Sequence, residues 1–138
     1  EVAVPEKMNW EEADLTVTKM KNLASWKTAG VTLPNGKPLP ALSQPAALML
    51  PMGRLGPAFL AFPNFKTLFQ WNASLNNALT VGYFASRIKD PSLAPMSRGR
   101  GQAEVLTKSE LTELQNLLAK KGYEVGKIDG FLGTQTRA

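Results

Sequence analysis

The stretch from residue 90 to residue 105 constrains the fold of this 138-residue chain more than any other part of it. It contains two Pro, two Gly and the run Ser97-Arg-Gly-Arg-Gly101, a composition that is typical of linkers. Asp90-Pro91 also ends any helix that reaches it, because Pro disfavours helical geometry in the residue before it. We therefore expect a first domain in residues 1–89, a linker over 90–105 and a second, smaller unit in residues 106–138.

The composition is that of a folded, basic protein, with 43% apolar residues and a formal net charge of +5. This charge favours an acidic partner, and nucleic acid, an anionic membrane and the carboxylate-bearing bacterial wall all qualify. The chain has no Cys and no His, which excludes thiol nucleophiles, Cys/His metal sites and a Ser-His-Asp triad. We expect neither a metal nor a cofactor.

The first residues of the chain have a pattern that is typical of the middle of a longer polypeptide. They show no signal peptide, and the chain has no run of eighteen apolar residues that would span a bilayer. Glu1-Val-Ala-Val-Pro5 has the pattern of the end of a strand. We therefore expect the chain to be a fragment of a longer precursor.

Two signals predict a helix that runs from Asn9 to about Trp26. Asn9 and Glu12 have the spacing of a capping box, and Gly30 stands where a helix C-terminus is capped. Between them, apolar residues recur at the spacing of one helix face: Ala13, Val17, Met20 and Ala24.

Short strands and turns are predicted in the next part of the chain. The apolar runs 46–50 and 57–62 predict two strands, joined by a Gly-rich loop that lacks the Lys-Ser/Thr of a phosphate-binding loop. Asn35-Gly36 predicts a tight turn before them. After them, Asn64 is expected to cap a short helix and Ser74 a longer one.

The second unit opens with a clear helix signal. Thr107 and Glu110 form a capping box, and Gly122 stands at the end of the helix. Asp129-Gly130 lacks the alternating acidic ligands of a calcium loop and predicts a tight turn. Together the elements predict an α+β fold that is mainly helical, with a small β-hairpin and a partial helical module at the end.

Residues 63–74 carry the composition of a sugar-binding platform. They hold three aromatic residues and three amides, and such rings stack on pyranose faces while amides and hydroxyls bind sugar hydroxyl groups. Helix-end anchoring remains the alternative for Trp71 and Asn72, and core packing for Phe65 and Phe69. The candidate substrate-binding residues are Trp71, Asn72, Asn77, Ser74, Asn64 and Phe65.

All eleven carboxylates lie outside residues 15–89, a stretch that contains eight Lys or Arg. Cleavage of a glycosidic bond needs a carboxylic acid that protonates the leaving oxygen, and this stretch provides none. Either Glu1, Glu6 or another terminal carboxylate folds back into the site, or the acid lies upstream of Glu1. We favour the upstream position, because the terminal carboxylates have the character of helix-start and surface charges.

Residues 1–89 resemble the C-terminal half of the catalytic domain of the membrane-bound lytic murein transglycosylase B family. The resemblance is carried by Trp26-Lys-Thr-Ala-Gly30, Leu50-Pro-Met-Gly53, Gly56-Pro-Ala-Phe-Leu60 and Trp71-Asn-Ala-Ser74. Residues 106–138 are similar to the first half of a peptidoglycan-binding module, through Leu114-Gln115, Gly122-Tyr123, Ile128-Asp-Gly130 and Thr136-Arg-Ala138.

The resemblance implies a lysozyme-like fold and a lytic activity on peptidoglycan glycan strands. Such enzymes cleave the β-1,4 bond between N-acetylmuramic acid and N-acetylglucosamine, and one Glu acts as acid and then as base. That Glu would precede Glu1, so the resemblance implies no catalytic residue in this chain. It also implies that Trp71 and Asn72 line the saccharide cleft, whereas Asn77 replaces a common Tyr and loses a ring.

Two other functions compete with this one. A noncatalytic peptidoglycan-binding protein would hold the wall without cutting it. A basic nucleic-acid-binding domain is disfavoured, because Lys and Arg are spread through the chain without a recognised motif. The expected partners are glycan strands and the missing N-terminal half of the protein, in the periplasm, with membrane contact only through an upstream lipid anchor.

Overall fold

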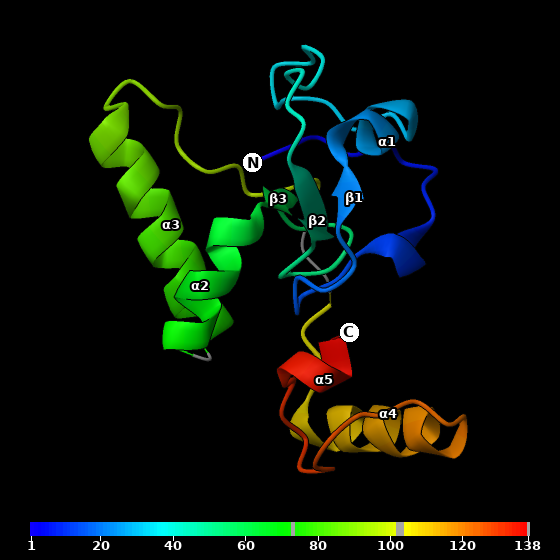
Figure 1. The fold of residues 1–138 in the computed structure, drawn as a ribbon. Helices are drawn as coiled ribbons and strands as arrows, with labels where there is room; N and C mark the ends of the chain where they lie inside the picture. Colours follow the sequence, from blue (N-terminus) through cyan, green and yellow to red (C-terminus); the bar gives the residue numbers. More distant parts are fainter. Residues whose placement is uncertain (73, 102–103, 138) are drawn as a thin grey trace. The chain divides into compact units, whose positions relative to one another are not determined.

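The structure, a computed structural model, describes residues 1–72, 74–101 and 104–137 (Figure 1). The chain divides into two compact units, residues 1–101 and 102–138. Helices and a small antiparallel sheet occur together in the first unit, which confirms the expected α+β class. The first unit contains the 3-10 helix η1 (Trp10–Glu12), β1 (Lys21–Asn22), α1 (Leu23–Thr28), β2 (Pro45–Met49), β3 (Phe59–Ala61), α2 (Pro63–Trp71) and α3 (Leu75–Lys89), and the second contains α4 (Lys108–Lys120) and α5 (Thr134–Arg137).

Three strands form the antiparallel sheet in the order β1-β2-β3, with β2 in the centre. β2 and β3 pair with Ala47 opposite Ala61, which confirms the hairpin predicted from the apolar runs 46–50 and 57–62. The loop between these strands is a turn, as expected, and Gly53 in it has a φ of 71°. β1 was not predicted, because two residues are too short to show an alternating pattern.

The turn predicted at Asn35-Gly36 is also present. Gly36 donates to the carbonyl oxygen of Leu33 at 2.9 Å and has a φ of 78°, a conformation that Gly adopts without steric cost. Thr32 and Pro38 form an isolated bridge on either side of the turn. The turn therefore closes a short loop between α1 and β2.

The central strand β2 contributes to two hydrophobic clusters. Ala46 and Leu48 belong to a cluster that contains Trp26, whose ring nitrogen donates to the Ala46 carbonyl oxygen at 2.7 Å. Ala47 and Met49 belong to the second cluster. Because successive side chains of a strand point to opposite faces, this one strand supplies both clusters.

The long helix predicted from Asn9 to Trp26 is wrong. Asn9 caps only the single turn of η1, and its side chain accepts a hydrogen bond from Glu11 rather than from Glu12. The α-helix in this region, α1, covers just six residues. Its end agrees with the prediction, because Gly30 has a φ of 85° immediately after the C-cap residue.

Asp14 explains why the predicted helix does not form. Its carboxylate accepts hydrogen bonds from the backbone N–H groups of Thr16, Thr18 and Lys19. These bonds compete with helical hydrogen bonding and hold the chain in a loop. Val17 inside that loop is buried and has a φ of 58°, which is incompatible with a right-handed helix.

The start of α2 corrects a second predicted cap. Asn64 lies inside α2, whose N-cap residue is Phe62. Pro63 occupies the first turn, where its fixed φ suits a helix and its missing N–H leaves no donor unsatisfied. The Phe62 carbonyl oxygen accepts a hydrogen bond from Phe65 at 2.9 Å, and the helix begins without a capping side chain.

Residues 90–101 form no helix or strand, and hydrogen bonds hold part of this segment against the first unit. The Arg100 N–H donates to the Leu55 carbonyl oxygen at 2.6 Å. The Arg100 guanidinium donates to the Arg54 carbonyl oxygen at 3.0 Å and lies 5.7 Å from the centre of the Trp10 ring. The domain boundaries proposed from the sequence stay a prediction.

The second unit begins with the predicted capping box. Thr107 accepts a hydrogen bond from the Glu110 N–H at 3.3 Å, and the Glu110 carboxylate accepts one from the Thr107 N–H at 2.7 Å. The Asp129-Gly130 pair forms a tight turn, as predicted, with a φ of 73° at Gly130. Across the described residues, no helix is both long and apolar enough to cross a membrane.

Candidate functional site

The first unit contains a cavity of about 710 Å³ between the sheet, α2, α3 and the segment that follows α3. Cavities of about 300 to 1,000 Å³ are the usual size for sites that bind small molecules. Most of the wall is apolar, and its larger side chains include Phe59, Phe62, Phe65, Leu68, Leu79 and Leu93.

Close packing of α2 against α3 shapes one side of the cavity, and α2 lies between α3 and β3 (Figure 1). Gly82 of α3 faces the Phe65 ring of α2, and a Cβ atom at position 82 would lie 3.9 Å from that ring. That distance is ordinary van der Waals contact, so the backbone of α3 at Gly82 lies directly beside the Phe65 ring. Asn64 and Phe65 line the cavity from the first turn of α2.

The segment after α3 closes the opposite side of the cavity. Tyr83 accepts a hydrogen bond at its hydroxyl oxygen from the Met96 N–H at 3.3 Å. The Glu1 carboxylate accepts hydrogen bonds from the Ser97 N–H, at 3.1 Å and 3.3 Å to its two oxygens. Polar groups at the rim therefore fix residues 90–97 over an apolar interior.

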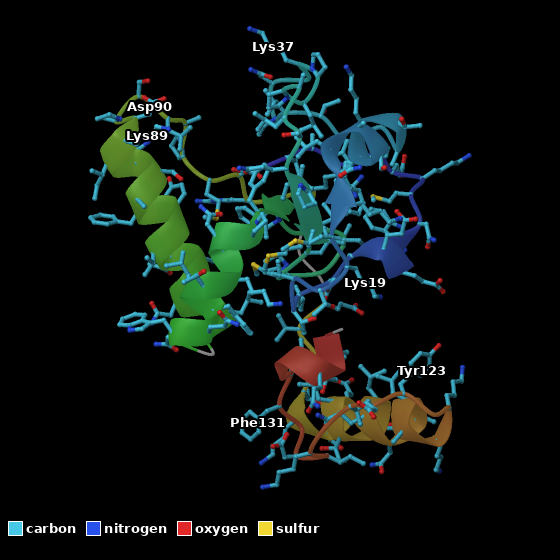
Figure 2. The ribbon with its side chains drawn as sticks, in the orientation of Figure 1. Lys19, Lys37, Lys89, Asp90, Tyr123 and Phe131 are labelled. Atoms are coloured by element: carbon cyan, nitrogen blue, oxygen red, sulfur yellow. The ribbon has the colours of Figure 1, made fainter. Side chains whose placement is uncertain are left out.

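Asp90 is the second carboxylate on the cavity wall, and it follows the C-terminal end of α3 (Figure 2). Its carboxylate accepts hydrogen bonds from the hydroxyl and the N–H of Ser92, and these bonds, with Arg87 nearby, lower the pKa of Asp90. A carboxyl group with a lowered pKa is ionised at neutral pH. It is therefore a poor general acid.

The turn between α2 and α3 is a second cluster of candidate residues. Trp71 ends α2, and its side chain is 79% exposed. The Asn72 side-chain oxygen accepts a hydrogen bond from the Ser74 N–H at 3.1 Å, and the Ser74 hydroxyl oxygen accepts one from the Asn77 N–H at 3.3 Å. Ser74 therefore caps α3, as predicted, and these polar side chains shape the turn beside an exposed ring.

The six predicted substrate-binding residues thus fall into two groups. Asn64 and Phe65 line the cavity, while Trp71, Asn72, Ser74 and Asn77 lie at or beyond the other end of α2. Asn64 and Trp71 are seven residues apart, which corresponds to about 10 Å along a helix axis. The structure does not bring all six into one cavity, and their role in binding stays a prediction.

Several cavity residues were not predicted. Tyr83 and Ser86 of α3 both line the cavity. They are three residues apart, and this spacing was a sequence signal that they share one face of the helix. Asp90, Ser92 and Ser97 come from the segment that the sequence indicated as a linker, and Asn35 comes from the predicted turn. Glu1 also lines the cavity, whereas Glu6 does not.

The second unit has an open pocket of about 520 Å³ along α4, and it exposes two aromatic side chains. Tyr123 and Phe131 lie near opposite ends of α4, with most of each ring accessible (Figure 2). The Lys108 ammonium lies 5.1 Å from the centre of the Phe131 ring. Within the part of the chain that the structure describes, no cluster of acidic residues could hold a metal ion.

The comparisons with known proteins identify the family. Two crystal structures of SltB3 from Pseudomonas aeruginosa match the chain, one in complex with NAG-anhNAM-pentapeptide at 35% identity and a TM-score of 0.76. The other is in complex with NAG-NAM-pentapeptide, at 37% identity and a TM-score of 0.77. Each match covers 99% of this chain and 36% of the SltB3 chain, so this chain spans about a third of that protein.

No curated protein gives a significant match. The likeness to SltB3 confirms the expected lysozyme-like α+β class. The family model described as Transglycosylase SLT domain matches residues 1–86, well over half of the chain. The chain therefore belongs to the transglycosylase SLT domain family.

Proposed function

We propose that this chain is part of a lytic transglycosylase of the membrane-bound murein transglycosylase B type, acting on peptidoglycan glycan strands. The match of residues 1–86 to the transglycosylase SLT domain carries the proposal. The muropeptide-like ligands in the two SltB3 complexes support a glycan substrate that bears stem peptides. The products would carry a 1,6-anhydromuramyl end.

The reaction needs one carboxylic acid, because the nucleophile belongs to the substrate. The acid protonates the leaving oxygen as the glycosidic bond breaks, and the muramyl 6-hydroxyl then attacks the anomeric carbon and returns its proton to the carboxylate. Residues 15–89 contain no Asp or Glu, and Asp90 has a lowered pKa. As the family resemblance implies, we propose that the acid is a Glu outside residues 1–138; the alternative is Glu1, whose carboxylate also lines the cavity.

The first unit supplies a wall of the substrate cleft. The exposed ring of Trp71 stacks on a sugar face, next to the amides and hydroxyl of the α2–α3 turn. All of the net positive charge lies in this unit, because residues 1–101 contain eleven Lys or Arg and six Asp or Glu. This charge favours a strand that carries the carboxylates of muramic acid and stem peptides.

The second unit acts as the beginning of a peptidoglycan-binding module that holds the enzyme on the wall. Its exposed Tyr123 and Phe131 rings offer contact surfaces for a sugar or a peptide. Because such a substrate lies in the periplasm, the proposal includes a periplasmic location for the protein.

Digestion of purified sacculi tests this proposal. The longest polypeptide encoded by the gene should release 1,6-anhydromuropeptides, detected by liquid chromatography and mass spectrometry. Residues 1–138 alone should sediment with sacculi and release none, because they lack the acid.

A noncatalytic peptidoglycan-binding protein is the second candidate, favoured by the absence of any Asp or Glu from residues 15–89. Binding of the longest encoded polypeptide to sacculi without release of anhydro products would support it. That result would contradict the transglycosylase proposal.

A further inference from the structure

The loop between β2 and β3 carries two exposed apolar side chains. Met52 is 67% exposed and Leu55 is 38% exposed. Two successive turns hold the loop, since the Gly53 N–H donates to the Leu50 carbonyl oxygen at 3.0 Å and the Gly56 N–H donates to the Gly53 carbonyl oxygen at 3.1 Å. The loop therefore presents its apolar side chains in a fixed conformation, and binding through them costs little ordering.

Basic side chains accompany these apolar ones. Arg54 lies in the loop itself, and the segment that follows α3 adds Arg98 and Arg100, all three exposed. The Arg100 guanidinium donates to the Arg54 carbonyl oxygen at 3.0 Å. Gly99, between the other two arginines, lies so close to the loop that a Cβ atom there would overlap the Leu55 carbonyl oxygen. The contacts thus define one surface, the loop patch, made of two apolar and three basic residues: Met52, Leu55, Arg54, Arg98 and Arg100.

Nearby carboxylates leave the loop patch an excess of positive charge. Residues 50–57 and 97–101 contain no Asp or Glu. Glu1, which contacts the segment after α3, lines the cavity. The 3-10 helix η1 adds Glu11 and Glu12, and a lysine lies beside each. The Lys19 ammonium donates to the Glu11 carbonyl oxygen at 3.0 Å. Lys21 forms an ion pair with Glu12 at 2.7 Å.

This combination of side chains suits a peripheral contact with an anionic bilayer. Apolar side chains enter the boundary between headgroups and acyl chains, while arginines bind the lipid phosphates. The Trp10 ring, whose centre lies 5.7 Å from the Arg100 guanidinium, adds a residue type that is enriched at membrane interfaces. An anionic wall polymer would also attract the arginines, but it offers no apolar phase to Met52 and Leu55. A bilayer accounts for both halves of the patch.

We propose that the loop patch docks the first unit on the surface of an anionic phospholipid bilayer. The contact is reversible and needs no membrane-spanning helix. Each arginine near such a surface strengthens binding about fivefold. The proposal is independent of glycan cleavage, because no residue of the loop patch lines the cavity or belongs to the α2–α3 turn.

Vesicle co-sedimentation tests the loop patch in the longest polypeptide that the gene encodes, purified without any attached lipid. Vesicles of phosphatidylethanolamine and phosphatidylglycerol, mixed at about 3 to 1, should bind the protein, and pure phosphatidylcholine vesicles should bind it at least about tenfold more weakly. Salt at about 0.5 M should weaken the binding, because it screens the arginines. Equal binding to the two kinds of vesicle, or to neither, would overturn the proposal.

Matched variants identify the residues that bind. Arg54→Gln should lower the affinity for the anionic vesicles about fivefold, and Lys37→Gln, which removes an exposed charge elsewhere, is its control. Met52→Ser should lower the affinity at least about fivefold, and Leu42→Ser, at a position that is 49% exposed, is its control. All four positions are exposed, so the Tm should stay unchanged. Losses in the controls equal to those in their partners would contradict a specific patch.

Lipid-free sacculi separate a bilayer from a wall polymer. Met52→Ser should bind sacculi as the unaltered protein does, because sacculi offer no apolar phase. Vesicle binding that depends on Arg54 but not on Met52, together with the same dependence for sacculi, would identify a general polyanion contact and would overturn the proposal.

Discussion

The side-chain oxygen of Gln115 accepts a hydrogen bond from the backbone N–H of Gly130 at 2.9 Å, across fifteen residues of the sequence. The same oxygen accepts one from Asp129, and the amide nitrogen donates to the carbonyl oxygens of Lys127 and Phe131. Gln115 is the buried polar residue at the centre of the second unit. One side chain of α4 therefore holds the loop that follows it.

We predict that Gln115→Leu unfolds this loop. Leu fills a similar volume but leaves unpaired the partly buried N–H of Asp129 and the buried N–H of Gly130, and the buried group alone costs about 1 to 3 kcal/mol. Amide hydrogen exchange at Gly130 should accelerate by at least about tenfold. Asn116→Ala, at the exposed neighbouring position of α4, is the control and should leave this exchange rate unchanged. Equal protection of Gly130 in the Gln115→Leu variant and in the unaltered chain would show that the network does not hold the loop.

Local signals predicted two helix starts correctly, those of α3 and α4. The capping box at Thr107 and the cap at Ser74 depend on hydrogen bonds within three residues, so the sequence contains both partners. The role of Gln115 depends on a loop that reaches it from fifteen residues away. A periodic sequence pattern does not predict such a contact, because only the folded loop brings its backbone groups to the Gln115 side chain.

The wrong or missing predictions also arise from contacts that a local pattern does not contain. Asn9 and the apolar residues after it fit a helix pattern, but the Asp14 carboxylate supplies competing partners that a pattern of apolar positions ignores. Residue types predicted that Asn64 and Phe65 belong to a site, and both line the cavity. The opposite wall, formed by residues that follow α3, was not predicted. A Pro- and Gly-rich segment has no apolar periodicity that would indicate which part of the fold it packs against.

We predict that acid weakens the first unit through Asp14. Partial burial raises the pKa of this carboxyl group, but hydrogen bonds from Thr16, Lys19 and Thr18 outweigh it and hold the pKa well below its usual range. A lowered folded-state pKa stabilises the fold fully above the unfolded value of about 3.9, and the stabilisation is lost as the pH falls below it. Stability of the first unit should therefore drop between about pH 5 and pH 2.

Asp14→Asn tests this mechanism. Because the amide cannot accept all of these hydrogen bonds, the free energy of unfolding at pH 7 should fall by about 1 kcal/mol. The dependence of Tm on pH below the unfolded pKa should also become flatter. Glu6→Gln, which removes an exposed carboxylate elsewhere, should keep the dependence seen in the unaltered chain. An unchanged pH profile in Asp14→Asn would assign the acid sensitivity to other groups.

We predict that Trp71→Ala weakens binding to sacculi without affecting the fold. The ring is largely exposed, so its removal costs little stability. Aromatic stacking contributes about 0.5 to 1.5 kcal/mol, which corresponds to a loss of about 2- to 12-fold in affinity. Co-sedimentation with sacculi measures the affinity, and Met52→Ala removes an exposed apolar side chain elsewhere as a control. Equal losses in the two variants would indicate nonspecific adsorption.

The last prediction concerns the segment that follows α3. Gly99 has a φ of 79°, and a Cβ atom there would overlap the backbone of Leu55 and Gly56. Gly99→Ala should therefore cost about 1 to 2 kcal/mol for the backbone conformation alone, and the overlap should detach the segment. The Arg100 N–H, which donates to Leu55, should then lose its protection from hydrogen exchange. Gly101→Ala is a matched control because a Cβ atom there meets nothing within 4 Å, and comparable loss of protection in both variants would contradict the proposed close approach.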